Sequence, residues 1–388
     1  MSNQETTTVE RYRIARSGTH EALHFQRRQS RQRALRPLCG RAAGEPKEAC
    51  AGESPGWRLS ACRHRREDHL PDAARQSPRS PLARERAGLR DISGRLGDME
   101  HEGIDAEICF PTLGLWLYAI GNAEAEAASA RLYNDWHIGF LGGHPDRFVQ
   151  CGMLPVIDFS ATLAELDYLA SRGVRSAMLP AVTPIGCPKY NDPAWDPVFA
   201  RAAALGIVFV MHTGTGMETV TAERGPGAAI INYSSQAMDA QLTAMYLIAG
   251  GVLDRNPGAK VAFIESGASW LVALGERMDE VAEAHEVFVR PKLSRKPSQI
   301  IDDQIWAAFQ HDRACILSAA KGLPGARNVM WGSDYPHAEG TWPTSRSLVA
   351  NFLNDPHFDD EAVKDCLGLN AARLFGIAPT IHTSVAAN

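Results

Sequence analysis

The chain has 388 residues, of which 45% are hydrophobic, enough to build the core of one large domain or of two smaller ones. No apolar stretch is long enough to span a bilayer, and the polar, then Arg-rich start lacks the apolar segment of a signal peptide. We therefore expect a soluble, cytoplasmic protein without a membrane partner. The eight cysteines are scattered and form no CxxC pair, a pattern that argues against a disulfide framework.

The net charge of −5 is distributed unevenly along the chain. Residues 1–100 contain 20 basic and 13 acidic side chains, and every basic one except Lys47 is Arg. This part has few aromatics and no helical or strand period, so it cannot bury enough apolar surface to become ordered. We interpret residues 1–88 either as a disordered basic arm that could touch nucleic acid or as the product of a shifted reading frame. No nucleic-acid motif supports the first interpretation, and we expect no nucleic-acid partner.

From about Leu89 onward, strand-like segments alternate with helix-like ones. Strands are predicted at residues 105–112, 148–156, 174–182, 207–214, 260–267, 304–312 and 328–336. Helical spacing of apolar residues appears at 123–142, 160–173, 196–206 and 270–285. Such alternation is typical of parallel strands joined by right-handed helical crossovers.

The seven predicted strands fit a TIM-type (β/α)8 barrel that covers residues 89–378 and takes its first strand from the N-terminal part. The only candidate for that strand is residues 9–20, which start like a strand and then enter the Arg-rich segment. A doubly wound open sheet is the alternative, but no GxGxxG turn follows an early strand. Residues 379–388 are expected to form a flexible tail.

Ionisable residues follow several of these strands directly. They are His212, Glu265, His311 with Asp312, and Asp334 with His337. In a barrel the carboxyl ends of all strands face one pocket, so these side chains are predicted to converge there. Imidazole and carboxylate groups are ligands for zinc or manganese, and the sequence therefore predicts one divalent metal ion at this end of the barrel.

The segments "MHTGTG", "FIESGASWL" and "GSDYPHAEGTWP" resemble the amidohydrolase-related (amidohydrolase 2) superfamily, in the branch that contains aminocarboxymuconate-semialdehyde decarboxylase. The resemblance extends over about residues 89–378. It implies a metal held by a His-x-His or Asp/Glu-x-His pair after strand one, by a His after strand five and by an Asp after strand eight. His212 matches the strand-five ligand and Asp334 the strand-eight ligand.

The sequence departs from this pattern in two places. Glu265 stands where many relatives have a catalytic His, and its charge and pKa differ from those of imidazole. At strand one, only His20 could match the second member of the ligand pair, because Gly18 lies two positions before it. The metal ligands implied by the resemblance are therefore His212, Asp334 and His20, one fewer than the full set.

The resemblance implies a metal-dependent enzyme, and we interpret the chain as a non-oxidative decarboxylase (carboxy-lyase) of a small unsaturated or aromatic carboxylic acid. Asp334, Glu265 and His337 are the predicted catalytic residues, since they could transfer protons beside the metal. A metal-dependent hydrolase of a C–N, C–O or activated C–C bond would use the same ligands. A ligand-poor, inactive barrel that only binds a small molecule is a third interpretation.

Three aromatic residues could contact a planar substrate near the pocket. They are Trp116, Tyr118 and Trp342, and barrel packing is the alternative for each. A small-molecule substrate is the expected partner. The resemblance to this branch also implies a homodimer.

Overall fold

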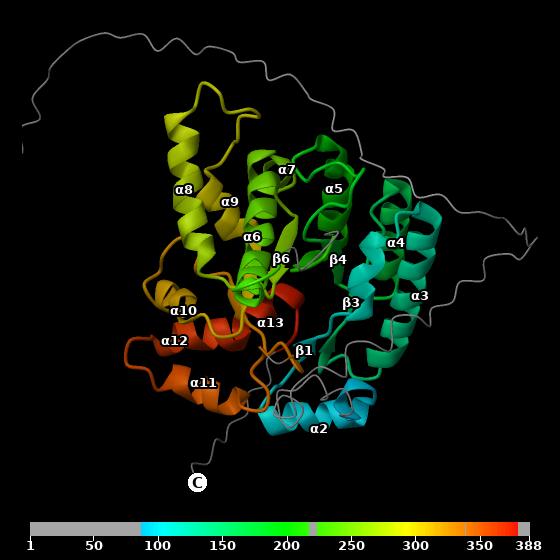
Figure 1. The fold of residues 1–388 in the computed structure, drawn as a ribbon, viewed down its shortest axis with the longest axis vertical. Coiled ribbons are helices and arrows are strands. Elements are labelled where there is room, and N and C mark those ends of the chain that lie inside the picture. The colour runs from blue at the N-terminus through cyan, green and yellow to red at the C-terminus, as the bar shows by residue number, and fades with distance from the viewer. Residues whose placement is uncertain (1–86, 217–222, 338, 379–388) are drawn as a thin grey trace, which may run out of the picture. The chain divides into compact units, whose positions relative to one another are not determined.

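A computed structural model of the chain describes residues 87–216, 223–337 and 339–378 (Figure 1). The strand predicted at 9–20, most of the Arg-rich segment 1–88 and the tail at 379–388 lie outside these described residues. None of the described helices combines the length and hydropathy that crossing a membrane requires.

All seven predicted strands are confirmed, and all pair in parallel. They are β1 (Glu107–Ile108), β2 (Phe148–Val149), β3 (Cys151–Met153), β4 (Ser176–Pro180), β5 (Val208–His212), β6 (Lys260–Ile264), β7 (Ile305–Phe309) and β8 (Val329–Trp331). The strand predicted at 148–156 is divided by Gln150 into β2, which pairs with β1, and β3, which pairs with β4. From β3 to β8 each strand pairs with the next in sequence order, as in a barrel.

Helices surround the sheet and connect consecutive strands, except β2 and β3, which only Gln150 separates (Figure 1). Those predicted from sequence correspond to α3 (Ala123–Leu141), α4 (Phe159–Ser171), α5 (Asp196–Leu205) and α8 (Trp270–Ala284). The others are α2 (Ile92–Glu102), α6 (Ala228–Ala249), α7 (Val252–Arg255), α9 (Pro297–Gln304), α10 (Arg313–Ala320), α11 (Ser345–Leu353), α12 (Asp360–Lys364) and α13 (Asn370–Phe375). The architecture is therefore the α/β, TIM-type arrangement that the alternation predicts.

Local sequence determines where these helices begin and end. The side-chain oxygen of Asn122 accepts a hydrogen bond from the N–H of Ala125 at 2.9 Å, so Asn122 caps α3. Asp158 caps α4 in the same way through the N–H of Ser160. Helix α5 ends at Gly206, which has a φ of 67° and so adopts the left-handed conformation of a C-terminal cap.

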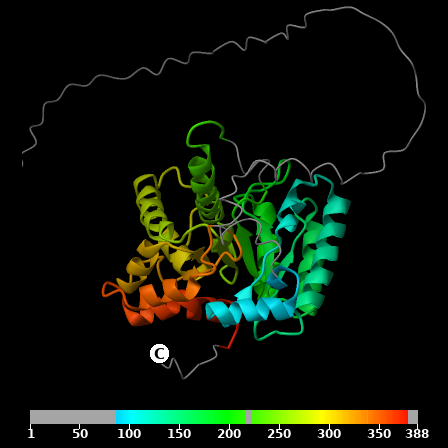
Figure 2. The same ribbon diagram turned by 60° about the horizontal axis from the view of Figure 1, so that its bottom comes forward.

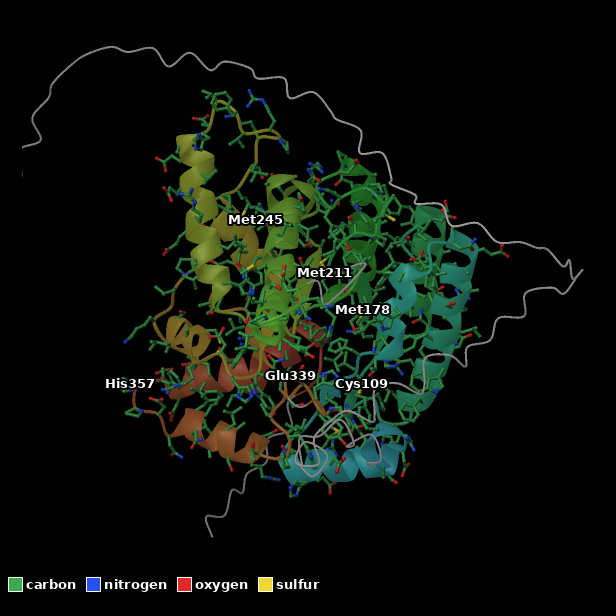
Figure 3. All side chains as sticks on the ribbon, viewed as in Figure 1. Cys109, Met178, Met211, Met245, Glu339 and His357 are labelled. Carbon is green, nitrogen blue, oxygen red and sulfur yellow. The ribbon has the colours of Figure 1, made fainter. Side chains whose placement is uncertain are left out.

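The core lies on both faces of the sheet, because the strands are almost continuously apolar. Every residue of β4 and β5 is buried. Met178 of β4 and Met211 of β5 are labelled within this interior in Figure 3. Strands buried on both faces are expected where helices cover a parallel sheet.

Within the described residues the sheet does not close into a full barrel, since β8 pairs only with β7 and β1 only with β2. Helices α2 and α11 instead meet across the gap, side by side in Figures 1 and 2. The Glu102 carboxylate accepts a hydrogen bond from the N–H of Ser345 at 2.9 Å, and Arg346 donates to the main-chain oxygens of Glu100 and His101 at 2.6 Å. Side-chain contacts thus join the element before β1 to the element after β8.

One buried histidine of the core is expected to make stability depend on pH. His137 of α3 is 3% exposed, and its Nε2 accepts a hydrogen bond from the N–H of Cys151 at 3.2 Å. Burial lowers the pKa of His137 to about 4. Because the unfolded chain binds the proton at a pKa of about 6.5, stability is complete above that pH and falls as the pH decreases toward 4.

We expect this one group to lower the free energy of unfolding by about 2 kcal/mol between pH 7 and pH 5. Urea unfolding of the wild type and of a His137→Gln variant at both pH values measures the effect. The variant should lose less stability than the wild type over this interval. Equal losses would mean that His137 does not carry the effect.

Candidate active site

His212, Glu265 and Asp334 lie at the carboxyl ends of their strands, as the sequence predicts. His212 is the last residue of β5, Glu265 follows β6 directly, and Asp334 comes three residues after β8. The Nε2 atom of His212 lies 3.0 Å from Oε2 of Glu265. Its Nδ1 lies 2.8 Å from the main-chain oxygen of Thr213, an acceptor, so Nδ1 carries a proton and the ring orientation is fixed.

His337 stands between two carboxylates. Its Nδ1 lies 2.7 Å from Oδ1 of Asp334 and 3.7 Å from Oε1 of Glu265. Glu339 adds a third carboxylate, and one ligand atom each from Glu265, Asp334, His337 and Glu339 lie within 4.8 Å of one another. The structure therefore brings the predicted catalytic residues Asp334, Glu265 and His337 into one cluster.

The backbone is strained at two residues of this cluster. Glu265 has a φ of 61° and Asp334 a φ of 53°, and no other non-glycine residue in the described part has a positive φ. The left-handed conformation is disfavoured for residues with a Cβ, and such outliers concentrate at functional sites. The fold thus holds these two carboxylates in orientations that regular backbone would not give them.

Burial and hydrogen bonding shift the pKa values of the cluster in different directions. Burial raises the pKa of Asp334 to about 6, although His337 opposes the shift. The hydrogen bonds that His337 donates to Asp334 and Glu265 raise the pKa of His337 to about 10. Burial acts to raise the pKa of Glu265, but hydrogen bonds from His212 and His337 outweigh it and lower that pKa.

At neutral pH the cluster therefore holds an imidazolium at His337, beside an ionised Glu265 and an Asp334 that titrates near neutrality. Burial also opposes protonation of His212, but its hydrogen bond to Glu265 outweighs burial and raises its pKa. Groups that titrate close to the working pH are suited to proton transfer. The cluster can thus both donate and accept protons.

Asp312, which follows β7, supports the loop that carries Glu265. Its Oδ2 accepts hydrogen bonds from the N–H groups of Ala268 and Ser269 at 3.1 and 2.8 Å, next to the start of α8. Its Oδ1 accepts from the N–H of Cys315 at 3.3 Å and so caps α10. One carboxylate therefore satisfies N–H groups at the beginnings of two helices.

We expect Asp312→Ala to lower the free energy of unfolding by about 2 to 3 kcal/mol, because α10 loses its cap and the segment before α8 loses two hydrogen bonds. Asp312→Asn should recover most of the loss, since the amide oxygen can still accept hydrogen bonds. Asp359→Ala is the matched control, because it removes two hydrogen bonds to N–H groups of α12 alone. Its free energy of unfolding should fall by about 1 kcal/mol. Denaturant titrations compare the three, and equal losses for Asp312→Ala and Asp359→Ala would contradict the double role.

The three aromatic residues predicted to bind substrate occupy different environments. Tyr118 lies in the core at 4% exposure, and its hydroxyl donates to the main-chain oxygen of Met178 at 2.9 Å, so the structure shows its packing role. Trp116 is 55% exposed in the same 3-10 segment, Leu113–Ala119. Trp342 is buried, and its ring lies 5.3 Å from that of Tyr335. His20, the third predicted metal ligand, lies outside the described residues.

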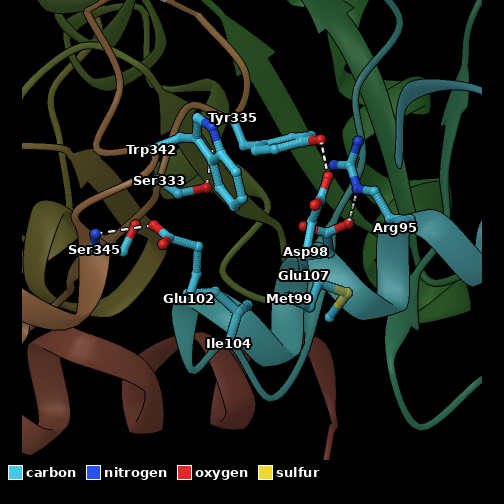
Figure 4. A pocket seen from close by; sticks show the side chains of 10 residues that line it. All are labelled: Arg95, Asp98, Met99, Glu102, Ile104, Glu107, Ser333, Tyr335, Trp342 and Ser345. Atoms are coloured by element: carbon cyan, nitrogen blue, oxygen red, sulfur yellow. Dashed lines mark hydrogen bonds and ion pairs between the residues drawn. The ribbon is translucent and has the colours of Figure 1, made fainter. Parts of the chain in front are cut away.

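A pocket lies between α2 and the loop after β8, and Trp342, one of the predicted substrate-binding residues, lines it (Figure 4). Arg95 forms an ion pair with Glu107, and the Tyr335 hydroxyl donates to Asp98. The Arg95 guanidinium also lies 4.7 Å from the centre of the Tyr335 ring. Ser333 and Tyr335, the two neighbours of Asp334 in sequence, line this pocket, but Asp334 and the other cluster residues do not.

The cluster residues fit a divalent metal ion. Oδ2 of Asp334 is buried and has no hydrogen-bond partner among the described residues, and buried polar atoms normally have one. Carboxylate and imidazole are suitable donors for zinc and manganese.

Figure 3 shows the exposed His357 at the periphery of the molecule, away from Glu339, consistent with a surface role for His357.

The family is established by comparison with known proteins. The model of the amidohydrolase family matches residues 69–377, and the chain therefore belongs to this family. A 2-amino-3-carboxymuconate-6-semialdehyde decarboxylase of Dictyostelium discoideum is 26% identical over 261 residues, which cover 64% of this chain and 67% of the relative.

Two solved structures support the same fold. The 5-carboxyvanillate decarboxylase from Sphingomonas paucimobilis has a TM-score of 0.61 at 23% identity, covering 78% of this chain and 88% of that one. A dihydroxybenzoic acid decarboxylase from Polaromonas sp. JS666, solved with bound manganese and the inhibitor 2-nitroresorcinol, has a TM-score of 0.59 at 18% identity, covering 80% and 92%. The fold inferred from strand and helix alternation is thus confirmed.

Proposed function

We propose that this protein is a metal-dependent, non-oxidative decarboxylase of a small unsaturated or aromatic carboxylic acid. The observation that carries the proposal is the cluster of Glu265, Asp334 and His337 beside His212 at the carboxyl ends of the strands. The comparisons support the proposal, because the similar proteins named above are decarboxylases.

His212 and Asp334 would hold the metal, zinc or manganese, with His20 as the further ligand implied by the resemblance. When bound, the metal supplies positive charge that orients and polarises the substrate carboxylate or a neighbouring oxygen. The manganese in the Polaromonas structure supports a divalent ion.

His337 is the proposed proton donor. As the bond between the carboxylate carbon and the substrate breaks, its electron pair stays on the substrate carbon, and carbon dioxide leaves. That carbon then takes a proton from the imidazolium of His337, which Asp334 and Glu265 hold in place. Solvent then returns a proton to His337 and restores its imidazolium.

The proposal is tested by incubating the metal-loaded protein in deuterated water with the acids that its relatives' names indicate: aminocarboxymuconate semialdehyde, 5-carboxyvanillate and dihydroxybenzoate. We expect release of carbon dioxide and one deuterium on the carbon that carried the carboxylate. A product formed without carbon dioxide would refute decarboxylation. His212→Asn serves as the control without the strand-five ligand.

Hydrolysis is the second candidate, and one observation favours it. Asp334 combines a pKa near 6 with an oxygen that has no partner among the described residues, properties of a general base that could deprotonate an attacking water. Incorporation of 18O from labelled water into the product, without carbon dioxide, would identify this reaction.

The proposal also includes a cytoplasmic location, which cell fractionation tests, and a homodimer, which sedimentation tests.

A further inference from the structure

We infer that helix α6 is the surface through which two copies of this chain form a dimer, with the α6 helices of both copies packed against each other. This inference rests on the proposed function, of which the homodimer is a part, and it adds the surface that the partner covers. Helix α6 (Ala228–Ala249) is the first described helix after β5.

Helix α6 exposes several large apolar side chains. They are Ile230, Ile231, Tyr233, Met238 and Leu242, each between 45% and 76% exposed. Among the other described helices none exposes more than two, and those two are Leu132 and Trp136 of α3. Large apolar side chains gathered on one element, unlike isolated ones, mark an interaction surface.

The spacing of these side chains places three of them on one stripe. Ile231, Met238 and Leu242 are seven and four residues apart, so they lie on the same side of the helix. Ile230 and Tyr233 lie in the first part of α6, where every residue from 229 to 235 except Asn232 is exposed. In Figure 2 this end of α6, coloured green, projects from the body of the protein. The stripe is therefore accessible to a partner.

Helix α6 is held in place before any partner binds. In its first part, Oδ1 of Asn232 accepts a hydrogen bond from the N–H of Glu223 at 2.9 Å, and Nδ2 donates to the main-chain oxygen of Glu223 at 3.1 Å. In its second part, the Thr243 hydroxyl donates to the main-chain oxygen of Ala181, and Leu247 is fully buried. A surface that is already ordered loses little conformational entropy on binding.

The charge of α6 fits a second copy of the same surface. Asp239 is the only charged residue in this helix of 22 residues, and burial raises its pKa, which favours the neutral form. Two α6 helices can therefore meet around a twofold axis without strong repulsion between like charges. The buried centres of homodimer interfaces are also apolar and depleted of charge.

The same composition disfavours charged partners. Helix α6 contains no Lys or Arg, whereas helices that lie on membrane surfaces are rich in both. A nucleic acid would also find no positive charge on α6 to bind its phosphates. The five apolar side chains instead suit the centre of a protein interface, which occupies about 800 Å² of each copy in a stable dimer.

Sedimentation equilibrium of the full chain over a range of concentrations tests the inference. We expect the wild type to be a dimer in the micromolar range. Met238→Glu and Ile231→Glu each place a carboxylate in the stripe, where it meets the same charge of the partner. Each should raise the dissociation constant of the dimer about a hundredfold or more. Leu132→Glu, which changes an exposed Leu of α3, is the matched control and should remain a dimer.

Circular dichroism and urea unfolding verify that each variant is folded, which is expected because all three positions are exposed. Three results would overturn the inference: a monomeric wild type, a dimer that persists in both α6 variants, or dissociation of Leu132→Glu as complete as that of Met238→Glu.

The inference and the proposed reaction fail separately. A dimer that dissociates in the α6 variants, together with no release of carbon dioxide from any of the tested acids, would count against the proposed reaction alone. Release of carbon dioxide by a wild type that dimerises through another surface would count against the inference alone.

Discussion

The Asp334→Asn variant is expected to lose catalytic activity by about a thousandfold or more while keeping its fold. Asn has almost the same shape as Asp and tolerates the left-handed backbone that position 334 adopts, with a φ of 53°. The substitution therefore removes the negative charge and little else. Without that charge the site loses a metal ligand and the anchor of the His337 imidazolium, 2.7 Å away.

The Asp334→Asn variant should lose activity but not stability. Burial raises the pKa of Asp334 to about 6, so the folded state favours the protonated form and the ionised group disfavours folding above that pH. Removing the charge should leave the free energy of unfolding at neutral pH equal to or above that of the wild type. Turnover assays, metal analysis and urea titration measure these quantities together. An unstable Asp334→Asn variant, or one with full activity, would contradict this account.

Gly216→Ala is expected to destabilise the protein by about 3 to 5 kcal/mol, near the upper end for a single substitution. Gly216 has a φ of 78°, and a Cβ there would lie 1.6 Å from the main-chain oxygen of Val182 and 2.8 Å from Cβ of Pro180. The neighbouring Thr215 accepts hydrogen bonds from the N–H groups of Ala181 and Val182 after β4, so the backbone cannot move away without breaking them. The loop after His212 should consequently be displaced.

Gly173→Ala separates the steric effect from the backbone effect. Gly173 has nearly the same φ, 77°, but a Cβ there meets nothing within 4 Å. We expect it to lose about 1 to 2 kcal/mol, the usual penalty for the left-handed conformation. Thermal and urea unfolding compare the two variants. Similar losses at both positions would mean that the contact with Val182 relaxes easily.

The strands and the convergence of His212 with Glu265 could be predicted because they depend on local patterns. Apolar runs such as 207–214 and 260–267 have strand length, and parallel pairing aligns their carboxyl ends. A polar residue at the end of each run must then lie beside its neighbour, and the observed 3.0 Å contact agrees. The catalytic roles of these residues stay predictions.

The position of Glu339 could not be predicted from the sequence. It lies in a Gly- and Pro-rich loop without periodicity, where side-chain direction depends on individual dihedral angles such as the φ of Asp334. The same limit applies to the contact between Arg95 and Tyr335, which arises from packing of segments about 240 residues apart. Tyr118 illustrates a further limit, since an aromatic near a strand end can serve either a pocket or the core.

The contact between α2 and α11 has a consequence for the order of folding. Glu102 and Ser345 are 243 residues apart, so their hydrogen bond closes one of the longest loops in the chain. Closing such a loop becomes favourable only after the intervening strands have paired and shortened the distance between its ends. During synthesis, moreover, α11 leaves the ribosome long after α2. The two helices must therefore join late, and until then the edges that β1 and β8 present among the described residues can pair with other chains.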